Sequence, residues 1–207
     1  MISCENGEKL VKIARSAVKY YLTDSTIIDP EGIARVSHKV GAFVTLNSLD
    51  RDNKEHLRGC IGYPLPEKRL YKSVIEASIA AATQDPRFPR VTLHELANII
   101  FEISVLTPLE EIKAESTTDY EKNIKIGRDG LILQSPYGAG LLLPQVPVEM
   151  NWSVNDYLSN LCRKAGAPSS TWLISRWKLF RFEAFVFKEL TPDGKVIRVT
   201  LESKDSL

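Results

Sequence analysis

Residues 56–64 constrain the fold of this chain more than any other stretch, because two glycines, a cysteine and an arginine fall within five of them. Glycine weakens a strand and often marks a place where another backbone or a ligand comes close. In an extended segment side chains alternate between faces. His56, Arg58 and Cys60 are therefore expected on one face, and Leu57 on the other, directed into a core. The pattern predicts a strand that carries a site.

The chemistry of that site centres on a thiol. An arginine two residues from a cysteine can lower the pKa of the thiol, since a fixed positive charge favours the thiolate. Cys60 is therefore a candidate nucleophile and Arg58 its candidate activator. The alternative is that Cys60 is a small apolar residue of a central strand, because cysteine outside disulfides is among the most buried residue types. His56 is not a direct base for Cys60, since residues i and i+4 of a strand lie roughly 13 Å apart.

Composition bounds the class of protein. The chain has 207 residues, 43% hydrophobic and 26% charged, which suits one globular domain, or one domain with a smaller lobe, around a sizeable core. Its 27 basic and 26 acidic residues give a net charge of +1. This balance argues against a nucleic-acid grip built on bulk positive charge, and leaves open a local basic patch.

Several classes of site and location are not expected. The N-terminus has no basic segment followed by an apolar run, and no apolar stretch reaches the length of a membrane span. The three distant cysteines indicate a reducing compartment, so the cytoplasm is the expected location. Three cysteines and three histidines without paired short spacing predict no metal site. Phosphate-loop and dinucleotide fingerprints are absent from the sequence, and we expect no cofactor.

Periodicity predicts a mixed fold. Apolar residues at helical spacing predict helices over 8–22, 67–84, 92–97 and 154–165. Strand formers and alternation predict strands over 41–46, 56–62, 100–106, 179–187 and 196–201. Asp129-Gly130, between residues 124–126 and 131–134, predicts a further hairpin. Tight turns between strands favour an α/β (α+β) fold whose largely antiparallel sheet is covered by helices. We expect a single domain over 1–207, with a smaller subdomain within about 110–150, where a polar, acidic stretch begins.

Other side chains are candidates for the same site. Arg87 and Phe88 lie on a loop stiffened by two prolines, and Glu102 lies on an otherwise apolar strand. With Arg58 they would line a cleft for a small polar or anionic ligand, because arginine binds carboxylate or phosphate bidentately. Equally, Arg58, Arg87 and Glu102 would form a buried ion-pair network. Gln145 would add amide recognition or bond a loop backbone.

Several of these segments, in this order and over residues 10–200, resemble the AMMECR domain family. The segments are Gly41–Leu46, Leu57–Gly62, Asp85–Pro89, Glu102–Leu106, Leu142–Val146 and Leu161–Gly166. The resemblance implies an α/β fold with a larger and a smaller subdomain, and a cleft near Leu57–Gly62, where Gly59 and Gly62 would leave room for a ligand. It implies no known reaction. Some bacterial relatives are similar to partners of Memo-like and radical S-adenosylmethionine proteins, which suggests a modification pathway.

Two hypotheses about function follow. One is an enzyme, or an enzyme component, that acts on a small molecule, a nucleotide or a modified RNA in the Arg58/Cys60 cleft. The other is a non-enzymatic module that binds a protein or a nucleic acid, for which arginines beside Tyr63 and Phe88 would combine charge with stacking. The two hypotheses differ at Cys60, since only a nucleophile needs its sulfur.

Overall fold

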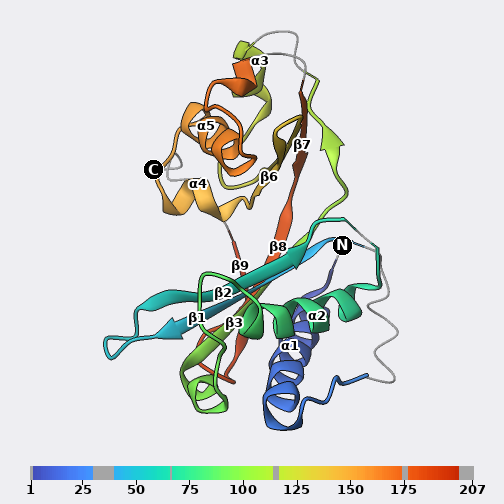
Figure 1. The fold of residues 1–207 in the computed structure, drawn as a ribbon, viewed down its shortest axis with the longest axis vertical. Helices are drawn as coiled ribbons and strands as arrows, with labels where there is room; N and C mark the ends of the chain where they lie inside the picture. The colour runs from blue at the N-terminus through green and yellow to red at the C-terminus, as the bar shows by residue number, and fades with distance from the viewer. Residues whose placement is uncertain (1, 30–39, 66, 114–116, 174–176, 201–207) are drawn as a thin grey trace. The chain divides into compact units, whose positions relative to one another are not determined.

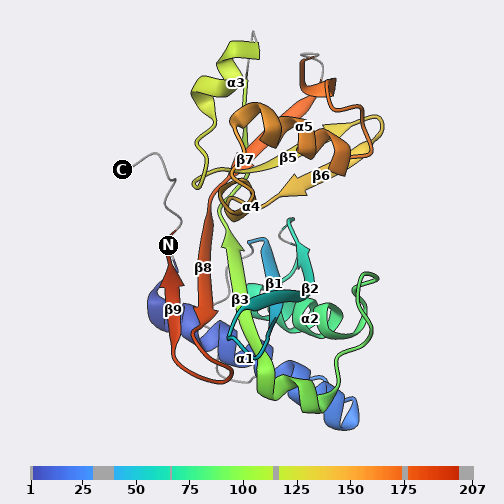
Figure 2. The same cartoon turned by 90° about the vertical axis from the view of Figure 1, so that its left-hand side faces the viewer.

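A computed structural model describes residues 2–29, 40–65, 67–113, 117–173 and 177–200. The chain forms an α+β fold in two compact units, each with a sheet of its own (Figures 1 and 2). Each unit also has its own apolar core. The first unit joins Met1–Leu106 to Phe185–Val199, and the second contains Thr107–Ala184. In the described part of the chain, no helix is long and apolar enough to cross a membrane.

The first unit is built on a five-stranded sheet with the order β2-β1-β3-β8-β9. Its strands are β1 (Ala42–Leu49), β2 (Glu55–Tyr63), β3 (Ile99–Leu106), β8 (Ala184–Glu189) and β9 (Val196–Val199). β1 pairs antiparallel with β2 and β3, and β8 pairs antiparallel with β9. These pairings confirm the predicted antiparallel sheet and its first hairpin. The last residue of the strand expected at 196–201 lies outside the described residues.

Helices cover one face of this sheet. They are α1 (Cys4–Asp24) and α2 (Leu70–Thr83), with a short 3₁₀ helix, η2 (Leu93–Asn98), before β3. α2 lies against β1 and β2, and α1 lies against β3 and β9. The apolar stripe of α1 and nearly the whole of α2 are buried, and they share one core with the inward residues of β1 and β3, such as Val44, Leu46, Phe101 and Ile103.

A buried ion pair joins α1 to β8. The Arg15 guanidinium donates to both carboxylate oxygens of Glu189, at 2.7 and 2.5 Å. Arg15 also donates to the carbonyl oxygens of Leu96 and Ile99, and Glu189 accepts the N–H of Phe101. Because the carboxylate and the guanidinium each have several hydrogen-bond partners, much of the cost of burying these charges is offset. The network explains why the first unit needs the late residues of the chain.

The second unit has a four-stranded sheet with the order β4-β7-β5-β6. Its strands, β4 (Glu110–Glu111), β5 (Gly130–Ser135), β6 (Gly138–Leu142) and β7 (Lys178–Phe182), pair antiparallel. Its helices are α3 (Thr117–Asn123), α4 (Gln145–Glu149), α5 (Val154–Lys164) and the 3₁₀ helix η3 (Thr171–Leu173). α5 starts at a capping box of Ser153 and Asp156 and buries its apolar side, including Cys162.

The prediction of a hairpin at Asp129-Gly130 is wrong. The Asp129 carboxylate is buried, accepts the Lys125 N–H at 2.8 Å and pairs with Arg128 at 2.6 Å, so it closes a turn after α3. Gly130 is the first residue of β5, where a Cβ would overlap the Phe182 ring. The hairpin forms later, between β5 and β6, where Ser135 pairs with Gly138.

The strand predicted over 179–187 is two strands in different sheets. β7 ends at Phe182 and β8 starts at Ala184. Between them the Glu183 carbonyl accepts the Thr107 N–H, and the Glu183 N–H donates to the Thr107 hydroxyl, each at 2.8 Å. Residues 107 and 183 therefore hold together the two places where the chain passes between the units. The range 110–150 covers only the first part of the second unit, which also contains α5 and β7.

Candidate functional site

Three side chains of the first sheet form a cross-strand row. In the strand register Cys60 lies opposite Thr45, and Thr45 lies opposite Glu102. The Thr45 hydroxyl donates to the Cys60 sulfur at 3.3 Å. The neighbours of Thr45, Val44 and Leu46, are buried in the core under the helices. Because side chains alternate along a strand, the row lies on the other face of the sheet, opposite α1 and α2.

The main chain of Cys60 is held by the loop that follows α2. β2 is an edge strand, and such strands present main-chain groups that need partners. The Asp85 carboxylate accepts the Cys60 N–H at 2.9 Å, and Arg87 reaches the Cys60 carbonyl oxygen at 3.5 Å. Arg87 and Asp85 also pair through two hydrogen bonds, of 3.0 and 2.7 Å. We call these three residues the edge clamp.

Charges in the edge clamp depend on one another. The Asp85 side chain is 2% exposed, and its hydrogen bonds from Arg87 hold the pKa of the carboxyl far below its usual range. In turn Asp85 chiefly raises the pKa of the Arg87 guanidinium, with a smaller contribution from the charge of Cys60. Arg87, 52% exposed in its side chain, also lies 5.4 Å from the Phe88 ring. A cation is therefore held beside Cys60 at the sheet edge.

Arg58 is directed away from this row. A bulge in β2 places Gly59 opposite Leu46 and Leu57 opposite Asn47, so Arg58 is the extra residue between them. Its guanidinium pairs with Glu95 at 2.9 Å and donates to the Pro89 carbonyl oxygen at 2.8 Å. The two-residue alternation expected for this stretch is broken.

The core position predicted for Leu57 is therefore wrong. Its side chain is 43% exposed, and the bulge places it on the same face as Cys60. The expectation that Arg58 and Cys60 share a face rested on the same alternation, which the inserted residue interrupts.

Both glycines of the stretch are explained by packing. A Cβ on Gly59 would overlap the carbonyl oxygen of Ala81 in α2, and a Cβ on Gly62 would overlap the ring of Phe43 on β1. The helix and the aromatic ring therefore occupy the space expected for a ligand. Gly59 lets α2 approach the sheet, and through that contact fixes the strand that carries Cys60.

The remaining candidates divide between the units. Glu102 belongs to the row on the first sheet, whereas Gln145 starts α4 in the second unit, where it is buried. Cys162 is buried in the core of the second unit, and burial raises the pKa of its thiol. Cys4 is exposed at the start of α1. Among the described residues, no three of His, Cys, Asp and Glu are grouped to hold a metal ion.

Sequence reasoning missed Thr45, Asp85 and Glu95. Thr45 enters the row through strand register, which needs the position of the bulge. Asp85 had a local signal, since an Asp-Pro-Arg sequence can place a carboxylate and a guanidinium two residues apart at the end of a helix. A second polar group was also missed: Lys188 pairs with the Glu55 carboxylate at 2.6 Å, and Asn47 donates to it at 3.0 Å.

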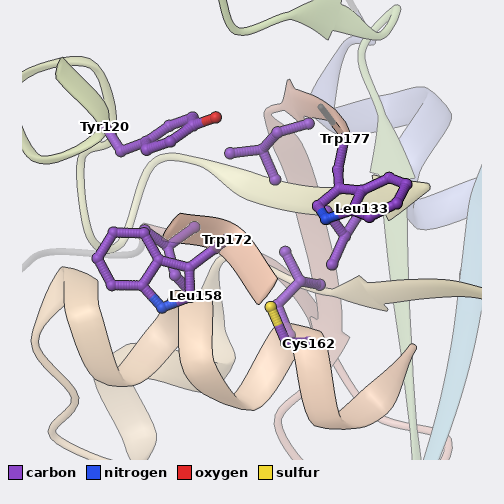
Figure 3. A pocket seen from close by; sticks show the side chains of 8 residues that line it. Tyr120, Leu133, Leu158, Cys162, Trp172 and Trp177 are labelled. Atoms are coloured by element: carbon purple, nitrogen blue, oxygen red, sulfur yellow. The ribbon is translucent and has the colours of Figure 1, made fainter. Parts of the chain in front are cut away.

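A small hollow lies within the second unit (Figure 3). Its lining is Tyr120, Leu133, Leu158, Leu161, Cys162, Trp172, Trp177 and Leu179. Tyr120 meets Trp172 edge to face at 6.3 Å between ring centroids. The surroundings are mostly apolar, and the enclosed space suits about one water molecule. We regard it as a gap in the second core.

Comparison with known proteins decides the family, because the AMMECR1 model matches residues 11–187. The chain belongs to the AMMECR1 family. Among AMMECR1 relatives, it is 46% identical over 201 residues to Protein MJ0810 of Methanocaldococcus jannaschii, covering 97% of this chain and 98% of that protein. It is also 46% identical over 202 residues to Protein PYRAB00100 of Pyrococcus abyssi, with coverage of 97% and 98%. The crystal structure of uncharacterized protein PH0010 from Pyrococcus horikoshii is similar, with a TM-score of 0.91, 42% identity and coverage of 97% of this chain and 99% of that one.

Proposed function

We propose that the Cys60–Thr45–Glu102 row binds a small polar ligand and that Cys60 is its nucleophile. The single observation behind this proposal is the strand register, which aligns a thiol, a hydroxyl and a carboxylate on the face of the sheet opposite its helices. The proposed ligand is a small molecule or a nucleotide, or a modified base of an RNA.

Each member of the row has a distinct chemical role in this proposal. The Thr45 hydroxyl already donates to the Cys60 sulfur, an interaction that favours the thiolate over the thiol. Glu102 supplies a hydrogen-bond acceptor two strands away, where a ligand with an amine, amide or hydroxyl group would be oriented. The thiolate would then form a bond to a carbon or phosphorus centre of the ligand, while the bond from that centre to its leaving group breaks and the group departs with the electron pair.

The test combines ligand screening with three variants. Wild type is screened by thermal shift against nucleotides, phosphosugars and S-adenosylmethionine, and each hit is titrated against Cys60→Ala, Thr45→Val and Glu102→Gln. We expect Glu102→Gln to weaken binding by about 1.5–3 kcal/mol, the value of a hydrogen bond to a charged group. Cys60→Ala should bind the ligand and fail to form a covalent adduct, read by mass spectrometry. A hit whose affinity is equal in all four proteins contradicts the proposal.

A second function is favoured by exposed apolar side chains along β2. Leu57, Tyr63 and Leu65 are 43%, 39% and 53% exposed on this edge strand and just after it. Apolar side chains exposed along an edge strand fit a non-enzymatic module that binds a partner protein. In that case purified Memo-like or radical S-adenosylmethionine proteins, the partners suggested by family resemblance, would bind the wild type and Cys60→Ala equally. A Leu57→Ser, Leu65→Ser variant would bind them more weakly.

A further inference from the structure

The edge clamp joins one strand to one loop through a closed ring of hydrogen bonds. Asp85 accepts from the Cys60 N–H and from Arg87, and Arg87 reaches the Cys60 carbonyl oxygen. The ring fixes the peptide groups on both sides of the Cys60 side chain. It also fixes the guanidinium, whose charge would otherwise move with a long, half-exposed side chain. A purely structural edge cap would need no permanent cation.

We infer that Arg87 stabilises the thiolate of Cys60 and that Asp85 is a positioning residue acting through Arg87. The inference rests on the proposed function, because it concerns the nucleophile of that site. It assigns to Arg87 the activating role that the sequence analysis predicted for Arg58. Arg58 is instead occupied by Glu95 and the Pro89 carbonyl oxygen.

The charges around Cys60 determine in which direction each substitution should shift the balance between thiol and thiolate. On β1 its neighbour is the neutral Thr45, and on β3 the next member of the row is the carboxylate of Glu102. The loop adds Asp85, which is negative, and Arg87, which is positive. On β2 itself Arg58 is paired with Glu95. Removing Asp85 would favour the thiolate if its charge acted directly, and would disfavour it if Asp85 acts by holding Arg87.

The experiment measures the rate of Cys60 alkylation by iodoacetamide between pH 5 and 10 on the full-length protein without ligand. The thiolate sulfur forms a bond to the methylene carbon, the carbon–iodine bond breaks and iodide leaves with its electron pair. The proton of the thiol passes to the buffer, so the rate follows the thiolate fraction. Peptide mass spectrometry separates Cys60 from Cys4 and Cys162.

Three variants decide the inference. Arg87→Met should raise the midpoint of the profile by about one pH unit and slow Cys60 labelling at neutral pH about tenfold. Arg87→Lys keeps the positive charge and loses the paired hydrogen bonds. It should therefore slow Cys60 labelling less than Arg87→Met does. Asp85→Asn should also slow labelling, although it removes a negative charge. A faster rate in Asp85→Asn, or a wild-type profile in Arg87→Met, overturns the inference.

Controls are available in the same chain. Arg90→Met removes one positive charge from the same loop and should leave the Cys60 profile unchanged. The exposed Cys4 is an internal reference, and a urea titration followed by circular dichroism checks that each variant is folded. If Arg87→Met is unfolded, Arg87→Lys and Asp85→Asn decide. The alkylation experiment uses the protein without ligand, so a negative result there does not contradict ligand binding measured with the Thr45 and Glu102 variants. Likewise, a failure to find a ligand does not contradict the effect of Arg87 on Cys60 labelling.

Discussion

Gly59 shows how one residue in this protein serves the site through packing. A Cβ there would overlap the Ala81 carbonyl oxygen of α2, which cannot move without the helix, and a Cβ on Gly62 would overlap both the Phe43 ring and the Ala42 carbonyl oxygen of β1. We therefore expect Gly59→Ala and Gly62→Ala each to lower the free energy of unfolding by about 1–3 kcal/mol, the usual cost of overpacking. Urea titrations followed by circular dichroism measure both. A stability equal to that of wild type in either variant would contradict this account of the two glycines.

Arg58 provides a second test at the scale of the residue. Its guanidinium links β2 to Glu95 and to the Pro89 carbonyl oxygen, and lysine cannot reproduce two such directional bonds. Arg58→Lys should lower the free energy of unfolding by about 1–2 kcal/mol, while the affinity for any ligand of the row stays within twofold of wild type. Urea titration and thermal-shift titration measure the two quantities. A wild-type stability together with a tenfold loss of affinity would instead show that Arg58 contributes to ligand binding.

At the scale of elements, sequence patterns located most helices and strands but not their partners. Helical spacing found α1, α2 and α5, and alternation found β3, because these elements bury one face in a core. The hairpin prediction at Asp129-Gly130 failed because the Asp129 carboxylate accepts a hydrogen bond from the Lys125 N–H, which closes a turn before β5. Cys60 and Glu102 were found as residues, but Thr45 and the true position of Arg58 depend on a bulge. One inserted residue changes which side chains share a face, and the alternation of residues along β2 does not indicate where that residue is inserted.

The loop that forms the edge clamp makes stability depend on pH. The folded-state pKa of Asp85 lies below its ordinary value of 3.8, so its stabilising contribution is present at higher pH and is lost as the pH falls below about 4. We expect Asp85→Asn to be less stable than wild type by about 1–3 kcal/mol at pH 7, and the difference to shrink on acidification to pH 3. Urea titrations at several pH values measure it, with the exposed Asp52→Asn as control. A difference that is constant with pH would contradict the ionic role of Asp85.

At the scale of the whole molecule, the first unit is discontinuous, and the segment Thr107–Ala184 of the second unit is inserted between its two parts. The first core contains Phe187, and its buried ion pair needs Glu189, so β8 is essential to α1 and β3. Among the described residues, by contrast, the second core is formed between Ile112 and Leu179. Thr107 and Glu183, hydrogen-bonded to each other, mark the two ends of the insertion. We therefore expect truncation to have different effects on the two units: the first should not fold without its C-terminal strands, whereas the second should fold by itself.

A chain that ends at Leu106 should not fold, because Arg15 would be left buried without Glu189, a loss of about 3–5 kcal/mol, and the sheet would lack β8 and β9. Replacing residues 108–182 by a short glycine-serine linker should restore folding, since residues 107 and 183 are hydrogen-bonded neighbours. Residues 107–184 alone should fold as well, since β4, β5, β6 and β7 pair with one another in a sheet of their own and the described residues of this segment form the second core. Dispersion of amide signals in heteronuclear NMR spectra of the three proteins tests this. A folded 1–106 chain would show that β8 is dispensable, and an unfolded 107–184 chain would show that the second core is not sufficient.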